Sequence, residues 1–213
     1  MNRNTFHKIS YGVYVVSTWD HGRATGCTAN SVMQITSVPA TIAVSINHDN
    51  YTNACIKDLG RFAVSILAQD SEPSIIGTFG FQSGRDTDKF AQIKHRIEGG
   101  LPVIADSCGY LVCEVINQME TSSHTVFLGE VKEAELFGSR EPMTYAYYHN
   151  VIRGKSPKNA PTYIPEESSA SGADTPRLKF KCQVCGYVYE GESLPADYTC
   201  PICQAGADRF EKL

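Results

Sequence analysis

The sequence predicts a mainly β protein with two parts: a large antiparallel barrel with only short helices, and a small C-terminal domain held together by a metal ion. Segments rich in Val, Ile and Tyr recur through the first two thirds of the chain and end at turn residues, as strands do. Helical stretches are short and do not alternate regularly with the strands, which favours an antiparallel barrel over a doubly wound sheet. The C-terminal part contains two C-x-x-C motifs, Cys182 to Cys185 and Cys200 to Cys203.

The elements of the barrel follow from these patterns in chain order. Strands are expected at 11–19, 41–47, 62–68, 103–105, 110–118 and 124–137. A hairpin turn is expected at Asp20-His-Gly-Arg23. Asn50 is expected to cap a short helix that ends at Gly60, since glycine tolerates the left-handed conformation of a helix end. A second short helix is expected to open at Ser71-Glu-Pro73, because proline in a first turn removes only an N–H that has no partner.

The two C-x-x-C motifs predict a closed metal site. Each motif points two thiolates at one ion, and the fourteen residues between Cys185 and Cys200 allow a hairpin to return the second pair to the first. Four thiolates suit zinc and iron equally, so a structural zinc ribbon stays open here; a disulfide pairing would require an oxidising compartment. Residues 178–213 bury too little apolar surface to fold alone, so the metal supplies much of their folding free energy.

Composition limits the classes of function. The chain has 213 residues, 42% hydrophobic and 20% charged, as in globular proteins, and it contains no apolar run long enough for a membrane span. The N-terminal residues form no apolar signal segment, so a cytoplasmic location is expected. A net charge of -4 and the absence of a Lys or Arg cluster argue against a nucleic-acid partner. The other cysteines are interpreted as buried thiols: Cys27, Cys55, Cys108 and Cys113.

A linker is expected at residues 161–177, between a barrel domain at 1–160 and the metal domain at 178–213. Its acidic, Ser- and Gly-bearing composition cannot bury enough surface to offset its ordering entropy. A flexible segment of this length spans about 20 Å on average and about 50 Å when drawn out. The metal domain can therefore reach the barrel of its own subunit or of a partner subunit.

Two polar stretches of the barrel are candidates for a ligand site. Gly26 to Ser31 is expected to follow a strand, and Phe79 to Phe90 a helix. Both combine hydroxyls, an amide and small residues, and the second adds two cations; such groups hold a phosphate or the polar edge of a flavin. Plain turns have the same composition, so this alternative stays open. No G-x-G-x-x-G or P-loop motif is present, so a nucleotide would be held without that machinery.

The barrel sequence resembles the flavin reductase family across nearly all of residues 1–155. The resemblance lies in the segments 14–18, 26–36, 45–47, 79–90, 101–103 and 124–131, in that order. The stretch from Tyr147 to Tyr163 is similar to the tail of flavoredoxin-like members. The resemblance implies an FMN-binding split barrel that works as a homodimer, with the flavin near the subunit interface.

The C-terminal stretch resembles rubredoxin, the single-iron electron carrier. The resemblance lies in Phe180 to Tyr189 and in Cys200-Pro-Ile-Cys203, with Gly206, Asp208 and Phe210 behind them. Two departures are the short loop, which is similar to that of rubrerythrin tails, and Gln204 in place of the usual glycine. The resemblance implies iron rather than zinc, one Fe3+/Fe2+ ion per chain, in a more exposed site. The fused chain as a whole is similar to the high-molecular-weight rubredoxins.

The resemblance also implies roles for particular residues. The FMN would be lined by Thr28, Ala29, Asn30, Ser31, Ser45, Ile46 and Asn47. Its phosphate and ribityl chain would be held by Ser83, Gly84, Arg85 and Lys89. His124 would lie near flavin and nicotinamide as a catalytic residue, with a strand histidine bonded to backbone as the alternative. The iron would be bound by Cys182, Cys185, Cys200 and Cys203.

These features predict an oxidoreductase that passes electrons from NAD(P)H through FMN to the iron centre. The final acceptor implied by the resemblance is a flavodiiron protein that reduces O2 or nitric oxide. Two alternatives stay open. The protein could be an electron-transfer component that a separate NADH-dependent reductase reduces, or a reductase of free flavin or ferric chelates whose tail is a structural zinc ribbon.

Overall fold

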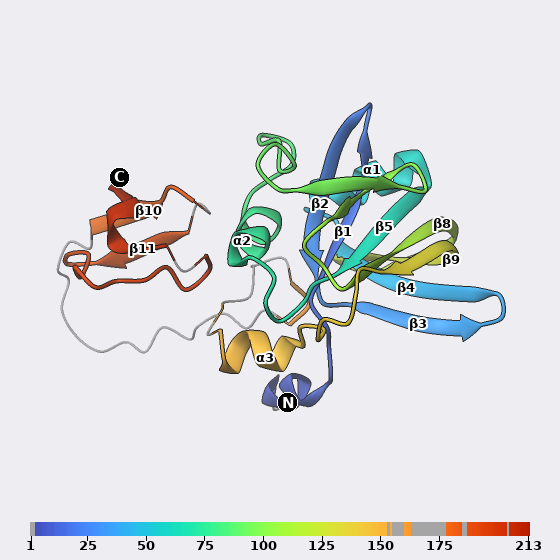
Figure 1. Cartoon of the computed structure of the whole chain (residues 1–213), viewed down its shortest axis with the longest axis horizontal. Coiled ribbons are helices and arrows are strands. Elements are labelled where there is room, and N and C mark those ends of the chain that lie inside the picture. Colours follow the sequence, from blue (N-terminus) through green and yellow to red (C-terminus); the bar gives the residue numbers. More distant parts are fainter. Residues whose placement is uncertain (1–2, 153, 155–159, 163–177, 185–186, 204) are drawn as a thin grey trace.

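The computed structural model describes residues 3–152, 154, 160–162, 178–184, 187–203 and 205–213, and it is mainly β with a few short helices (Figure 1). Seven antiparallel strands form one curled sheet, in which β2 and β3 lie at the two edges. In sheet order they are β2 (Arg23–Ala29), β1 (Tyr14–Asp20), β5 (Arg61–Ile66), β8 (Gly109–Glu120), β9 (His124–Leu136), β4 (Ala40–Asn47) and β3 (Val32–Ser37). The expected mainly β architecture with short helices is confirmed.

The remaining elements of the large domain cover the sheet. They are a 3-10 helix, η1 (Arg3–Lys8), the helices α1 (Tyr51–Leu59), α2 (Pro73–Phe81) and α3 (Tyr145–Asn150), and a small hairpin of β6 (His95–Glu98) and β7 (Leu101–Ile104). The C-terminal domain is a three-stranded sheet with the order β11-β10-β12. Its elements are β10 (Leu178–Cys182), β11 (Val188–Gly191), η2 (Ala207–Arg209) and β12 (Phe210–Lys212).

Three expected local signals are present in the structure. The turn between β1 and β2 places His21 and Gly22 at positive φ, as a tight two-residue hairpin requires. Gly60 ends α1 at a φ of 70°, and its N–H donates to Ile56 O at 2.8 Å, which closes the helix. Pro73 is the first residue of α2. These signals act within a few residues, which is why the sequence alone could predict them.

Two expectations about local structure were wrong. Gly26 to Ala29 does not follow a strand but is itself part of β2, a strand of small and polar residues that pairs with β1 over its whole length. Its pairing partner, rather than its own β propensity, makes it a strand. Asn50 occupies the N-cap position of α1, yet its side chain makes no capping hydrogen bond.

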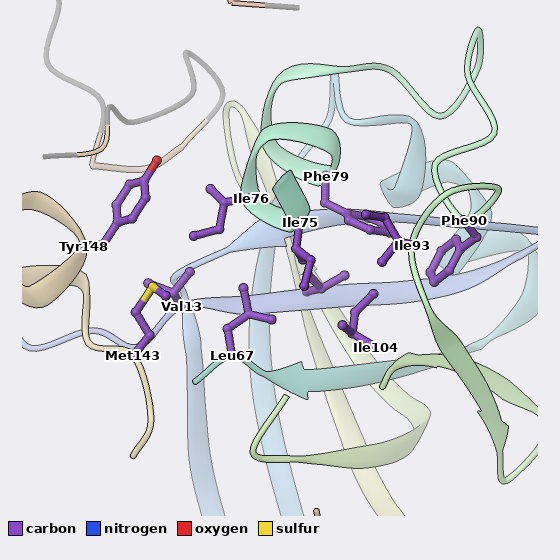
Figure 2. Packing of buried hydrophobic residues seen from close by; sticks show 11 residues of the cluster. Val13, Leu67, Ile75, Ile76, Phe79, Phe90, Ile93, Ile104, Met143 and Tyr148 are labelled. Carbon is purple, nitrogen blue, oxygen red and sulfur yellow. The ribbon is translucent and has the colours of Figure 1, made fainter. Parts of the chain in front are cut away.

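Three clusters of buried side chains form the core of the large domain, and two of them contribute residues to the pocket described below. One lies within the curve of the sheet and joins β1, β2, β4, β5, β8 and β9 to Ile56 of α1. The other lies beneath α2 (Figure 2), where Ile75, Ile76 and Phe79 pack with Leu67 and with residues before and within α3. The second cluster fixes α2 against one end of the sheet. Among the described residues, no helix is long and apolar enough to cross a membrane.

Candidate functional site: a pocket in the barrel and a thiolate cluster in the tail

A pocket that is partly open to solvent lies where the second half of β2 meets the end of β4. Backbone and side-chain bonds hold the two strand ends together: Ser45 N–H donates to Ser31 O at 3.1 Å, and Ser31 Oγ donates to Ser45 O at 2.7 Å. All seven residues expected along the flavin line this pocket, namely Thr28, Ala29, Asn30, Ser31, Ser45, Ile46 and Asn47.

Two buried polar atoms in this pocket have no hydrogen-bond partner within the described residues. They are Thr28 Oγ1 and Asn30 Oδ1. A buried polar group without a partner costs free energy, so such atoms in a pocket indicate a polar ligand. The amide oxygen of Asn30 accepts and the hydroxyl of Thr28 can donate or accept, which fits the ring edge of a flavin with its N–H and carbonyl groups. The residues present therefore fit a bound flavin.

The chain beyond α3 returns to this pocket. Ala160 and Pro161 line it, and the buried Thr162 contacts residues from two other elements. Its Oγ1 accepts from Asn30 Nδ2 at 3.1 Å and lies 2.6 Å from Tyr145 OH of α3. The first two residues of the expected linker, 161–162, thus pack on the barrel. The segment that leads to the metal domain starts at the pocket, and the other expected linker positions, 163–177, lie outside the described residues.

The second predicted stretch, Phe79 to Phe90, begins inside α2, and only Phe79 and Gly80 of it line the pocket. Ser83 and Arg85 are exposed; Ser83 Oγ accepts from Arg85 N–H at 3.2 Å, and the Arg85 guanidinium lies 5.4 Å from the centre of the Tyr51 ring. Gly84 is buried so close to Thr25 of β2 that a side chain would collide with its hydroxyl. None of Ser83, Gly84 and Arg85 is among the residues that line the pocket.

Lys89 is buried, with only 4% of its surface exposed. Its ammonium donates to Gly26 O of β2 at 2.9 Å and to Phe79 O of α2 at 3.3 Å. Burial lowers its pKa to about 8, and the neighbouring Cys27 thiol opposes this shift. In this position Lys89 joins α2 to the strand that lines the pocket.

His124 begins β9 directly opposite Asn47 of β4, which lines the pocket. The imidazole is half-buried, and its Nδ1 lies 2.8 Å from Ser123 Oγ. The ring is therefore held next to the pocket, although His124 itself is not among the lining residues.

The second site lies in the C-terminal domain, where Cys182, Cys200 and Cys203 bring their sulfurs within 4.8 Å of one another. The Sγ atoms of Cys182 and Cys203 are 3.6 Å apart. Sulfurs at the corners of a tetrahedron with metal–sulfur bonds of about 2.3 Å lie about 3.8 Å apart, whereas a disulfide is about 2.05 Å long. The three thiols therefore fit a metal ion. The fourth predicted ligand, Cys185, lies outside the described residues.

Backbone bonds form the two turns that present these sulfurs. Cys182 N–H donates to Tyr187 O and Cys200 N–H to Ala205 O, each at 2.8 Å. Tyr187 and Phe210 pack against the cysteines, as expected of an apolar wall. Tyr198 was missed by the sequence reasoning: its ring lies between Tyr189 and Phe210, and burial raises the pKa of its hydroxyl. These four aromatic residues have no regular spacing, so no local sequence pattern singles out Tyr198.

Sequence reasoning also missed a group of pocket residues. They are Val13, Asn50 at the N-cap of α1, Ile76 of α2, and Tyr145 and Tyr148 of α3. They come from segments far apart in the chain, and no local pattern distinguishes them from ordinary core residues. The four cysteines outside the C-terminal domain are buried free thiols, as expected.

Comparisons with known families agree with this division of the chain. Residues 6–156 match the flavin reductase like domain family, and residues 180–211 match the rubrerythrin, rubredoxin-like domain family. Among curated proteins, the chain is 42% identical over the full length of both sequences to the high molecular weight rubredoxin of Moorella thermoacetica. It is 36% identical to the NAD(P)H ferric-chelate reductase of Archaeoglobus fulgidus, over 77% of this chain and 98% of that protein.

Solved structures similar to the large domain include the NADH:FAD oxidoreductase SgcE6 of Streptomyces globisporus. It is 27% identical with a TM-score of 0.61, over 67% of this chain and 85% of that one. The same protein in complex with NAD and FAD fragments is 28% identical with a TM-score of 0.60, over 67% and 84% of the two chains. The flavin reductase PheA2 is 31% identical with a TM-score of 0.59, over 67% and 89%.

Proposed function

Because the chain belongs to the flavin reductase family and continues into a rubredoxin-like domain, we propose that it passes electrons from NAD(P)H through FMN to a four-cysteine iron centre and on to a partner protein. Flavin-linked electron transfer from NAD(P)H follows from the two joined families. FMN as the flavin, one Fe3+/Fe2+ ion per chain and the acceptor are our proposal.

The observation that supports this most is that one chain contains both the pocket and the thiolate cluster. NAD(P)H donates two electrons as a hydride and a four-thiolate iron accepts one at a time, so a flavin, which exchanges electrons singly or in pairs, is the chemistry that joins them. A tether of this length raises the local concentration of the iron at the pocket to about the millimolar range. Transfer within one molecule would then outcompete an encounter with a separate carrier.

The residues of the pocket would bind and orient the flavin. Thr28 and Asn30 would satisfy its polar edge, and Thr162 fixes the Asn30 amide so that its oxygen faces the pocket. His124 would lie at the nicotinamide side, opposite Asn47. Ser83, Gly84, Arg85 and Lys89 remain our proposed contacts for the phosphate and ribityl chain, which would extend beyond the residues that line the pocket; the Lys89 ammonium is bound to two backbone carbonyls.

We also infer a homodimer and a flavodiiron-type acceptor that reduces O2 or nitric oxide. The dimer is supported by large apolar side chains that are exposed on the edge strand β3 and just after it: Met33, Ile35 and Val38. The acceptor is supported by the chemistry of the thiolate site, which is closed to small substrates once four cysteines bind one ion and therefore suits delivery of electrons to another protein.

Removal of residues 164–213 tests the relay. The truncated barrel should oxidise NADH with free flavin or a dye at the rate of the full chain, and should deliver no electrons to the protein acceptor. The matched control is the full chain with zinc in place of iron, which keeps the fold of the tail but cannot change oxidation state. It should also fail to deliver; undiminished delivery by either protein would contradict the relay.

A second function is favoured by the ferric-chelate reductase of Archaeoglobus fulgidus, whose length the barrel part of this chain almost covers. In that case the barrel would reduce a ferric chelate directly, with electrons from NAD(P)H. The zinc-loaded chain separates the two functions, because direct chelate reduction would continue at its full rate without iron in the tail.

A further inference from the structure

The apolar core around the thiolates includes one side chain from the barrel domain. Buried Cys182, Cys200 and Ile202 form this core, and six partly buried residues pack against it. Five of the six belong to the C-terminal domain, and the sixth is Phe81, the last residue of α2. An aromatic ring of the barrel domain therefore packs against the buried cluster that contains Cys182 and Cys200.

The same end of α2 also forms part of the flavin pocket. Phe79 and Gly80 line the pocket, and the Phe79 ring packs edge-on against Phe90 at 4.9 Å between centroids. Figure 2 shows Phe79 within the core beneath α2, and Figure 1 shows α2 facing the C-terminal domain. Consecutive residues of one helix thus contact the pocket on one side and the thiolate cluster on the other.

Several contacts keep this helix end in place. Lys89 binds the carbonyl of Phe79 and that of Gly26, which ties the last turn of α2 to the pocket strand. Phe79 is 1% exposed and cannot rotate away without opening the core. Phe81, by contrast, is only half-buried, and it lies two residues after the buried Phe79. A rigid helix end that presents one partly exposed aromatic ring is the usual form of an anchor in a small, weak protein contact.

We propose that Phe81 is the docking residue that holds this chain's own metal domain, residues 178–213, against α2 with its thiolate ligands next to the flavin pocket. The inference rests on the proposed function. It adds to it the surface on the barrel, the end of α2, and the part of the chain that binds there, the metal domain. The contact is small, so docking is reversible, and the tether rather than the interface supplies most of the proximity. In the docked position one electron passes from the reduced flavin to the ferric ion, which becomes ferrous; the partner protein then reoxidises it.

Reversibility has a functional reason. The residues around Phe81's contact, Val184 and Tyr187 among them, are the apolar surface of the metal domain that lies nearest its cysteines. An acceptor protein would use the same surface to approach the iron. Phe81 and the acceptor therefore compete for this surface. A tight contact with Phe81 would block electron transfer to the acceptor, and loss of the contact would slow reduction of the iron by the flavin.

Nuclear magnetic relaxation of the zinc-loaded, full-length protein tests docking without any catalysis. In the wild type the amides of the metal domain should tumble with the barrel; in Phe81→Ala they should tumble faster and independently, while the barrel amides keep their relaxation rates. Phe81→Leu, which retains an apolar contact, should give an intermediate value. Phe6→Ala is the matched control: it truncates another phenylalanine, 45% exposed, that is not among the residues packed against the thiolate cluster, and it should change nothing.

Rapid-mixing spectroscopy of the iron-loaded protein without air tests the consequence. Flavin reduction by NADH should be unchanged in Phe81→Ala, whereas the later bleaching of the ferric-thiolate band should slow about tenfold, as expected for loss of one interface anchor. Delivery from chemically reduced iron to the acceptor should be undiminished.

Two results would overturn the docking proposal while leaving the relay intact. In the first, the metal domain of Phe81→Ala still tumbles with the barrel. In the second, it tumbles independently but the ferric-thiolate band bleaches at the wild-type rate. If NADH never reduced the iron of the wild-type protein, that result would contradict the relay itself. The relaxation measurement uses zinc-loaded protein, so it tests docking independently of that result.

Discussion

The pocket and the thiolate cluster are built in opposite ways. The pocket is formed by strands and helices that two clusters of eleven buried residues each hold in place. Among the described residues, the C-terminal domain has a core of three buried residues, and two of these, Cys182 and Cys200, are proposed metal ligands. The fold of the barrel holds the pocket in shape, whereas metal binding by the thiolate cluster holds the fold of the C-terminal domain together.

This difference explains how a single chain can combine two redox centres. The barrel can offer unpaired polar atoms to a flavin because its core stabilises the fold without them. The metal domain can stay small and movable because its ligands stabilise it, so it needs no large interface with the barrel. Changes at Cys200 and Lys89 test what stabilises each domain. Changes at Thr28 and Tyr145 test single hydrogen bonds at the pocket.

The largest effect is expected for Cys200→Ser, which removes a buried sulfur from the cluster. The variant should lose its metal, and residues 178–213 should lose their slow amide exchange, because metal binding supplies about 10 kcal/mol or more to such a domain. The barrel should keep its unfolding midpoint. Metal analysis and hydrogen exchange measure both. Cys55→Ser, at a buried thiol of α1, is the control and should retain the metal. A folded tail in Cys200→Ser would break the comparison.

A pH effect is expected next, from the buried Lys89. Its pKa is about 8 in the folded chain and near 10.5 when unfolded, so between these values the unfolded chain binds more protons. The free energy of unfolding should therefore rise with pH in this window, by up to about 3 kcal/mol from Lys89 alone. In Lys89→Met this part of the rise should be absent. Denaturant unfolding of both proteins from pH 7 to pH 10 measures the difference; parallel curves would contradict the assigned burial.

A smaller effect is expected for Thr28→Val, which replaces a pocket hydroxyl by a methyl group of equal size. Flavin affinity should fall about tenfold, because a ligand group loses its partner, while thermal stability of the flavin-free protein stays the same or rises. Thr25→Val is the matched control on the same strand: Thr25 Oγ1 is also buried and unpartnered among the described residues but does not line the pocket. Equal losses in both variants would show that Thr28 has no particular contact with flavin.

The smallest effect is expected for Tyr145→Phe, which removes the hydroxyl next to Thr162. One hydrogen bond contributes about 1 kcal/mol, so flavin affinity should fall by about fivefold or less, with faster amide exchange at residues 160–162. Tyr147→Phe on the same helix is the control, since Tyr147 does not line the pocket. Unchanged exchange at 160–162 would contradict the role of Thr162 in closing the pocket.

The sequence predicts best those features that depend on neighbours in the chain. The turn at His21 and Gly22, the end of α1 at Gly60 and the cysteine motifs are all specified within a few residues. The composition of Gly26 to Ser31 indicated a ligand site, but the same composition is typical of turns, and pairing of β2 with β1 is what makes its first part a strand. The pocket residues of β4, Ser45 to Asn47, were assigned only through the family resemblance.

Other features depend on contacts between distant segments and could not be predicted. Thr162 reaches Asn30 across 132 positions of sequence, although its surroundings are typical of a linker. Phe81 looks like one more apolar residue of α2, and its contact with the cysteines depends on how the metal domain returns to the barrel. Lys89 was assigned to a phosphate through the family resemblance and its charge; its burial and its two backbone carbonyl partners depend on contacts that the sequence does not show.

The central claim is that electrons enter at the pocket and leave through the thiolate centre of the same chain. The most direct test is a visible absorption spectrum of the purified protein, repeated without air after NADH is added. The account predicts a flavin band and a ferric-thiolate band that both bleach, the second at a rate independent of protein concentration. Flavin absorbance alone would contradict it by placing zinc in the tail, and two bands that NADH leaves unchanged would mean that a separate reductase loads this protein.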